Sequence, residues 1–363
     1  MIDTTSLRHL MPLLPPSEMA ARGFTSTCGH SSAETHERIT WKFNPPHDNG
    51  TFPRLTWNSS PSGDWLTAEV SLPKFLFGNN VRMVSDTDVR NALNGISCFI
   101  TETVGVPFDA LSALVGRVDY CWNFPVGETN VYTIISAASQ ASIPRMVRYH
   151  IGTTTTTFKQ QSKYITIYGK HAEVTTRVRE KTATDEELRA AVGQIRLEVS
   201  YRNSDGCKRL ARRYGLPERT AEMLLVGGIA HEELERALEA LNLDRPTKSS
   251  NARIDILRET YGDTGRFRAL VAFLTILDRY GENFWRQKIG GYSRSSYFEY
   301  ARALKVAGVW LKTDESIPPL RLVRSASMVK SQTSQSMSNT INHSPARTDF
   351  HNSSRLALVG ERM

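Results

Sequence analysis

The chain has 363 residues, of which 40% are hydrophobic and 23% charged, and its formal net charge is +8. This composition is typical of a folded protein with one large body or two domains, and it excludes global disorder. No apolar run approaches the roughly 18–20 residues that span a bilayer, no G-x-x-x-x-G-K-S/T loop occurs, and the four cysteines form no C-x-x-C pair. We therefore expect no membrane partner, no Walker-type nucleotide site and no cysteine zinc site, and a reducing cytoplasm fits the cysteine usage.

The basic surplus is divided between two parts of the chain. Residues 319–363 hold six basic and two acidic residues, so half of the +8 lies in this segment. A basic chain favours a polyanionic partner such as DNA, but a surplus this small and this divided indicates one only weakly.

Residues 1–60 are rich in Pro, Ser, Thr, Asn and His, and we interpret them as a variable N-terminal segment with short strands near 40–43 and 55–57. From about 60 to 205, alternating and helical spacings of apolar residues predict a β-rich block. Its expected strands are 65–72, 116–124, 153–158, 164–171 and 194–202. Its expected helices are 87–104, 130–141 and 182–191.

From 206 to 318 the spacing becomes helical. The expected helices are 207–214, 218–225, 232–241, 252–261, 266–280 and 297–307. Residues 319–363 are rich in Ser, Thr, Asn and Gln with few core residues, which predicts a disordered tail. The predicted fold class is therefore α+β, with an antiparallel β-sheet block followed by an α-helical block and the tail.

Polar residues of chemical interest fall on the same side of three expected strands. Alternation turns Asp119, Tyr168 and Glu198 away from the apolar side chains of their own strands, and a further strand adds Glu69. In one antiparallel sheet these residues share a face. Clustered carboxylates repel unless a cation neutralises them, and oxygen ligands favour Mg²⁺ or Mn²⁺. A neighbouring phenol could then attack a phosphodiester, although each residue taken singly also fits a solvated sheet face.

Five sequence blocks at these segments are similar, in order, to the gene II-type replication initiators of filamentous phages and their relatives on phages and plasmids. The blocks are MID at 1–3, EVSLPK at 69–74 with GNN at 78–80, GRVD at 116–119, YGKHAE at 168–173, and IRLE at 195–198 with YGLP at 214–217. The resemblance covers about residues 60–310. It implies a rolling-circle replication initiator that nicks one strand of double-stranded origin DNA through a tyrosine–5′-phosphate intermediate and later rejoins the displaced strand.

By position in these blocks, the resemblance implies roles for particular residues. Tyr168 is the expected nucleophile, and Lys170, on the same face if the strand continues, stabilises the phenolate or the phosphate. Asp119 and Glu198 are the expected ligands of Mg²⁺ or Mn²⁺, with Glu173 as a third candidate. The resemblance also implies a host helicase and polymerase as partners and the bacterial cytoplasm as the location. It does not specify the origin sequence, nor whether the protein forms a homo-oligomer at the origin.

Three further residues near these blocks have no settled role. Glu69 is a fourth candidate ligand. His171 is a ligand, a phosphate contact or a structural residue, with the last favoured. Tyr164 has no place in the pattern and is more readily a sheet-face aromatic than a second nucleophile.

A basic segment downstream is the strongest candidate for duplex contacts. Its sequence Leu-Ala-x-x-x-Gly-Leu at 210–216 resembles a helix-turn-helix, and the alternative is an αα-hairpin packed on the sheet. The basic residues before its turn are Lys208, Arg209, Arg212 and Arg213. A second segment, 286–294, mixes aromatic and basic residues, and both a single-strand clamp and a plain surface loop fit it.

Two other functions stay open at this point. One is a non-catalytic origin-binding or repressor protein that uses the helix-turn-helix-like segment. The other is a metal nuclease that activates water, which would nick DNA without becoming attached to it.

Overall fold

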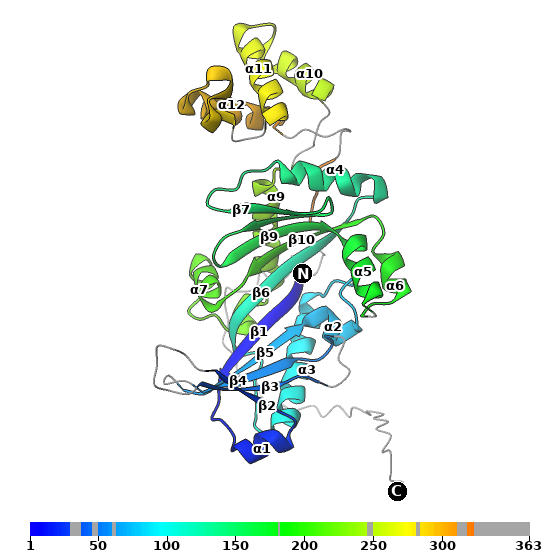
Figure 1. Cartoon of the computed structure of the whole chain (residues 1–363), viewed down its shortest axis with the longest axis vertical. Helices are drawn as coiled ribbons and strands as arrows, with labels where there is room; N and C mark the ends of the chain where they lie inside the picture. The colour runs from blue at the N-terminus through cyan, green and yellow to red at the C-terminus, as the bar shows by residue number, and fades with distance from the viewer. Residues whose placement is uncertain are drawn as a thin grey trace, which may run out of the picture. The chain divides into compact units, whose positions relative to one another are not determined.

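The computed structural model describes residues 1–322 without 30–37, 46–49, 60–62, 181, 245–249, 281–283 and 311–317. A ten-stranded antiparallel sheet with surrounding helices confirms the predicted α+β class (Figure 1). The predicted disorder of residues 319–363 falls, from 323 onward, outside the described residues. No helix in the described ranges is long and apolar enough to cross a membrane.

The strands are ordered β2-β3-β4-β5-β1-β6-β10-β9-β8-β7 across the sheet. Their bounds are β1 Ile2–Leu10, β2 Thr25–Gly29, β3 Arg38–Phe43, β4 Arg54–Asn58, β5 Trp65–Ser71, β6 Leu114–Pro125, β7 Val147–Ile151, β8 Thr155–Lys159, β9 Lys163–Gly169 and β10 Gln194–Tyr201. The predicted division at residue 60 does not match a break in this sheet, because β1 lies between β5 and β6 and β2 to β4 extend the same sheet (Figure 1).

The expected helices occur in the predicted order, and three further helices, at 16–21, 72–77 and 170–179, were not predicted. Their bounds are α1 Pro16–Ala21, α2 Leu72–Phe77, α3 Asp86–Val104, α4 Glu128–Ser139, α5 Lys170–Arg179, α6 Asp185–Ala190, α7 Ser204–Arg213, α8 Ala221–Leu224, α9 Gly227–Ala240, α10 Ser250–Tyr261, α11 Gly265–Tyr280 and α12 Arg294–Val306. The helix expected at 218–225 is a single turn, and a helix starts at residue 170, where the strand was expected to continue. Capping boxes at Ser85 and Thr184 satisfy the first N–H groups of α3 and α6.

One face of the sheet forms the core. Leu197 of β10 is fully buried and lies opposite Trp122 of β6 and Ile167 of β9. Helix α4 packs closely on this face, since a Cβ at Gly169 would lie 3.0 Å from a methyl group of Val131. Burying side chains of this size stabilises the fold by roughly 1.5–3 kcal/mol each.

The other face is polar and is partly covered by the loop between α2 and α3. Arg196 Nη1 donates to the carbonyl oxygen of Asn80 at 2.8 Å, and Asn123 Nδ2 donates to that of Val81 at 2.8 Å. The polar side chains of β6, β9 and β10 therefore lie beneath a fixed loop.

Candidate functional site

The strand register places the predicted catalytic residues on one face. In the strand register, Ser200 of β10 lies opposite Asp119 of β6, and Arg196 of β10 lies opposite Tyr168 of β9. Glu198 lies between Arg196 and Ser200 in the alternation of β10, so its side chain is on the same face. Asp119, Tyr168 and Glu198 therefore gather as the alternation of their strands predicted, although they are far apart along the chain.

Tyr168 is bonded directly to a carboxylate. Its hydroxyl donates to Glu198 Oε1 at 2.8 Å, and Arg196 Nε donates to the same oxygen at 2.9 Å. Burial and the charge of Glu198 hold the pKa of the half-buried Tyr168 phenol well above its usual value. Burial also raises the pKa of Glu198, against the opposing effect of Arg196. A neutral phenol thus meets a carboxylate that is positioned to accept its proton.

Arg196 is the centre of this cluster, and sequence reasoning gave it no role. Its guanidinium is fully buried and donates to Asp3 Oδ2 at 2.9 Å and to the sulfur of Cys121 at 3.0 Å. Asp3 in turn accepts a hydrogen bond from Ser71 at 3.0 Å. A signal was present, because Arg196 occupies the polar side of a strand with apolar residues on its other face, but its partners are remote in sequence.

Asp119 has its own arginine. Arg117 donates to both of its carboxylate oxygens, at 2.6 and 3.2 Å, and forms an ion pair with Glu69 at 2.9 Å. Burial raises the pKa of Asp119, while these bonds from Arg117 oppose the rise. Arg117 therefore links Glu69 to Asp119, at the end of the polar face that is distant from Tyr168.

The oxygen donors of this face suit Mg²⁺ or Mn²⁺ by chemistry, but their arrangement does not fit a bound ion. Within the described part of the chain, no three His, Cys, Asp or Glu side chains are grouped so that they could hold a metal. Asp3 and Glu198 face Arg196, and Asp119 faces Arg117. A cation could bind here only if a guanidinium moved away.

Lys170 lies beside Tyr168 for a different reason than expected. The prediction that its strand continues was wrong, because β9 ends at Gly169 and Lys170 opens α5. Its fully buried ammonium lies 5.9 Å from the centre of the Tyr168 ring and donates to Asn80 and Glu173, at 3.0 and 2.7 Å. Burial lowers the pKa of this ammonium.

The remaining candidates near this lysine have clear positions. Glu173 pairs with Arg177 at 2.7 Å as well as with Lys170, so it helps to hold that lysine. His171 is exposed on α5. Tyr164 shares the polar face, and the cations of Lys159 and Arg202 lie 5.5 and 5.3 Å from its ring. This position fits the sheet-face aromatic that the sequence favoured.

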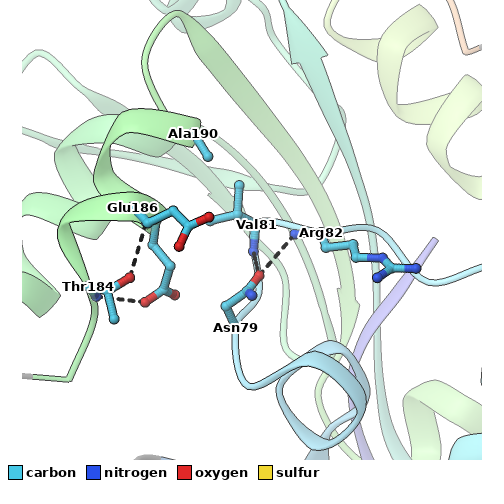
Figure 2. Close-up of a pocket in the computed structure, with 7 residues that line it drawn as sticks. Asn79, Val81, Arg82, Thr184, Glu186 and Ala190 are labelled. Carbon is cyan, nitrogen blue, oxygen red and sulfur yellow. Dashed lines mark hydrogen bonds between the residues drawn. The ribbon is translucent and has the colours of Figure 1, made fainter.

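A pocket of about 300 Å³ adjoins the cluster (Figure 2). It is lined by Asn79, Val81, Arg82, Thr184, Glu186, Glu187 and Ala190. Figure 2 shows the side chain of Asn79 accepting hydrogen bonds from the N–H groups of Val81 and Arg82, which shapes one wall. Asn80 of the same loop contacts Arg196 and Lys170, so the wall of the pocket and the cluster are directly connected.

The basic helix α7 is exposed on one side and packed on the other. Its basic residues Lys208, Arg209, Arg212 and Arg213 are all exposed, whereas Leu210 on its opposite side is fully buried. Arg213 pairs with the buried Glu233 at 2.6 Å. The following α8 is one turn long, so the segment matches the packed hairpin better than a helix-turn-helix with a reading helix.

Comparisons with known proteins assign no family to this geometry. No protein-family model and no curated protein matches the chain. Its function has to be argued from the side chains described above.

Proposed function

We propose that this protein nicks and rejoins DNA, with Tyr168 as the attacking residue. The observation that carries the proposal is the 2.8 Å hydrogen bond from the Tyr168 hydroxyl to Glu198, close to the cations of Arg196 and Lys170. In the reaction the phenolic oxygen bonds to phosphorus and the bond from phosphorus to the 3′-oxygen breaks. The departing 3′-oxygen takes a proton from water, so the strand leaves with a 3′-OH. Attack by that 3′-OH on the phosphotyrosine reverses the step and joins the strand.

The raised pKa of Tyr168 means that its proton has to leave during the attack. Glu198 already accepts that proton in a hydrogen bond, and burial makes its carboxylate a stronger base than an exposed one. The cations of Arg196 and Lys170 would stabilise charge that develops on the phosphate. We also propose Mg²⁺ or Mn²⁺ as the ion to test, with Asp119, Glu198 and Glu173 as the ligands that the sequence blocks imply. Binding to Asp119 and Glu198 would require Arg117 and Arg196 to move away, and no step here depends on the ion.

The five sequence blocks extend this proposal to a biological role. We propose an initiator of rolling-circle replication that acts on double-stranded phage or plasmid origin DNA and on the displaced single strand. Host helicase and polymerase are the implied partners and the bacterial cytoplasm is the implied location. The exposed basic residues of α7 support contact with DNA phosphates. They equally support the second candidate, a non-catalytic origin-binding protein.

The deciding experiment incubates the protein with supercoiled DNA of the phage or plasmid that encodes it. We expect a nicked circle with protein attached to the 5′ end, and no such adduct with Tyr168→Phe. Tyr164→Phe is the matched control, because it removes a hydroxyl from the same strand and face and should keep the adduct. Parallel reactions with Mg²⁺, Mn²⁺ and EDTA test the need for a cation separately.

Other outcomes identify the alternatives. Nicking that survives Tyr168→Phe and leaves no attached protein would mean that water is the nucleophile. Binding without nicking by the unmodified protein would favour the non-catalytic role. Mass spectrometry of the peptide linked to the oligonucleotide names the attacking residue directly.

A further inference from the structure

Aromatic and basic side chains meet at the surface where two short 3-10 helices, η1 (Phe284–Gln287) and η2 (Ile289–Gly291), lead into α12. The ring of Phe298 is 53% exposed, and Trp285 is half-buried beside it with 6.1 Å between ring centroids. Adjoining rings of this kind leave contiguous apolar surface in contact with water, and such surface often marks a binding site.

A core of other aromatic residues fixes these two rings. Phe273 of α11 and Phe284 are fully buried against each other, with ring centroids 5.3 Å apart. Tyr297 packs on Phe284 and also contacts Trp285 and Phe298, with centroids 5.7 and 5.4 Å away. Trp285 and Phe298 are therefore held in place before any partner arrives, which lowers the entropy cost of binding.

The charge around the two rings is positive. Residues 284–306 contain five basic residues and one acidic residue. The guanidinium of Arg286 lies 5.5 Å from the Trp285 ring, and that of Arg294 lies 5.9 Å from Phe298. Lys288 is exposed nearby, and among the described residues none of these three cations forms an ion pair. The one acidic residue, Glu299, pairs instead with a side chain of α11 at 3.6 Å.

We propose that this aromatic–basic surface, made of Trp285, Phe298, Arg286, Lys288 and Arg294, binds single-stranded DNA. Bases of a single strand have free faces that can stack on the two rings, whereas duplex bases are stacked on one another. The cations contact the phosphates of the stacked nucleotides. The proposed function enters only in the choice of DNA, since a displaced single strand is the product of nicking and unwinding. The stacking argument itself does not depend on Tyr168.

The test measures binding by fluorescence anisotropy with a labelled oligothymidylate of about 16 nucleotides, a length within known single-strand site sizes. The full chain carries Tyr168→Phe, so that no covalent step contributes. We expect Trp285→Ala with Phe298→Ala to weaken binding by roughly 30-fold or more, because each of the two stacked bases contributes at least about 1 kcal/mol. Tyr132→Ala is the control, since this ring is 56% exposed on α4 and should not matter.

Several results would overturn the proposal. One is unchanged affinity of the double variant, with thermal unfolding showing that it remains folded. Another is an equal loss of affinity for a duplex of the same length, which would leave only general charge attraction. A third is preference for oligouridylate over oligothymidylate, which would assign the surface to RNA. Arg286→Glu with Arg294→Glu provides a second variant that spares the rings and should also weaken binding. A missing adduct in the nicking experiment would leave these results unaffected.

Discussion

The two faces of strand β10 carry clusters built from the same residue types with opposite charge balance. On the core side, Glu233 of α9 is fully buried and accepts from Tyr201 at 2.5 Å, Lys163 at 2.8 Å and Arg213 at 2.6 Å. Burial alone would raise its pKa, but Lys163, Tyr201 and Arg213 together lower the pKa of Glu233 to about 2.

On the polar side, Glu198 also has a tyrosine and an arginine, yet its pKa is raised. Burial is the largest cause, and the negative charges of Asp3 and Asp119 add to it, against the opposing effects of Arg196 and of the hydrogen bond from Tyr168. The number of hydrogen-bond partners therefore does not reveal the role of a buried glutamate. A surplus of cations fixes Glu233 as a permanent anion that holds elements together, whereas a surplus of anions leaves Glu198 ready to accept a proton.

The largest effect that we expect is on catalysis. Replacing Glu198→Gln removes the proton acceptor but keeps an oxygen that can bond Tyr168. The nicking rate should fall roughly 10²- to 10⁴-fold, the usual contribution of a general base. Single-turnover nicking assays measure this change. Glu180→Gln, an exposed residue at the end of α5, is the control. Rates within a few-fold of the unmodified protein would remove Glu198 from the proton transfer.

The corresponding change on the core side should act on stability. Glu233→Gln leaves the cations of Lys163 and Arg213 without their buried anion. We expect the free energy of unfolding to fall by roughly 3–5 kcal/mol, as when one partner of a buried ion pair is removed. Urea unfolding measures the loss, and Glu239→Gln, exposed on the same helix, should change little. A loss of stability as small as that of the control would show that Glu233 does not hold its cluster together.

The contribution of Glu233 should also depend on pH. Its pKa is about 2 in the folded chain against an ordinary 4.5, so its stabilisation is complete above about pH 5 and is lost as the pH falls toward 2. The stability difference between the unmodified protein and Glu233→Gln should therefore shrink, by about 3 kcal/mol over the whole range. Urea unfolding at several pH values tests this. A difference that stays constant down to about pH 3 would contradict the lowered pKa.

Alternation made the shared polar face predictable, because β6, β9 and β10 each keep an apolar side and a polar side. It could not reveal β1, whose buried positions include the polar Asp3 and Thr5 in place of an apolar series. Nor could it show that Arg196 occupies the middle of the carboxylates, since that depends on which strands become neighbours. Asp119 and Glu198 share a face as alternation predicted, but Glu173 lies on α5 and pairs with Lys170 and Arg177, and the cationic partners of all three carboxylates come from the fold.

Glu233 escaped prediction for a related reason. In sequence it is one of several charged residues on an amphipathic helix, and such residues usually face solvent. Only the packing of α9 against β10 makes its position buried, and only the fold brings Lys163 and Tyr201 to it. The same residue type later in the same helix, Glu239, remains exposed.

The smallest effect compares the two tyrosines directly. Tyr201→Phe removes a buried donor to a fixed anion and should destabilise the protein by about 1.5–3 kcal/mol, the usual value for a hydrogen bond to a charged group. Tyr168→Phe removes a hydrogen-bond donor to the half-buried carboxylate of Glu198. Water can take the place of this donor, so the free energy of unfolding should fall by about 1 kcal/mol or less. Urea unfolding of the two variants under the same conditions provides the values.

Activity should rank the two tyrosine variants the other way. Tyr168→Phe should abolish the covalent adduct while barely affecting stability, and Tyr201→Phe should keep the adduct at temperatures where it is folded. Equal losses of stability in the two variants, with the adduct kept in both, would contradict this ranking. The charge balance around Glu198 and Glu233 would then not distinguish a reactive cluster from a structural one. Two single-atom deletions, in the neighbouring strands β9 and β10 and on opposite faces of the sheet, therefore test whether burial with excess cations and burial with excess anions serve different purposes here.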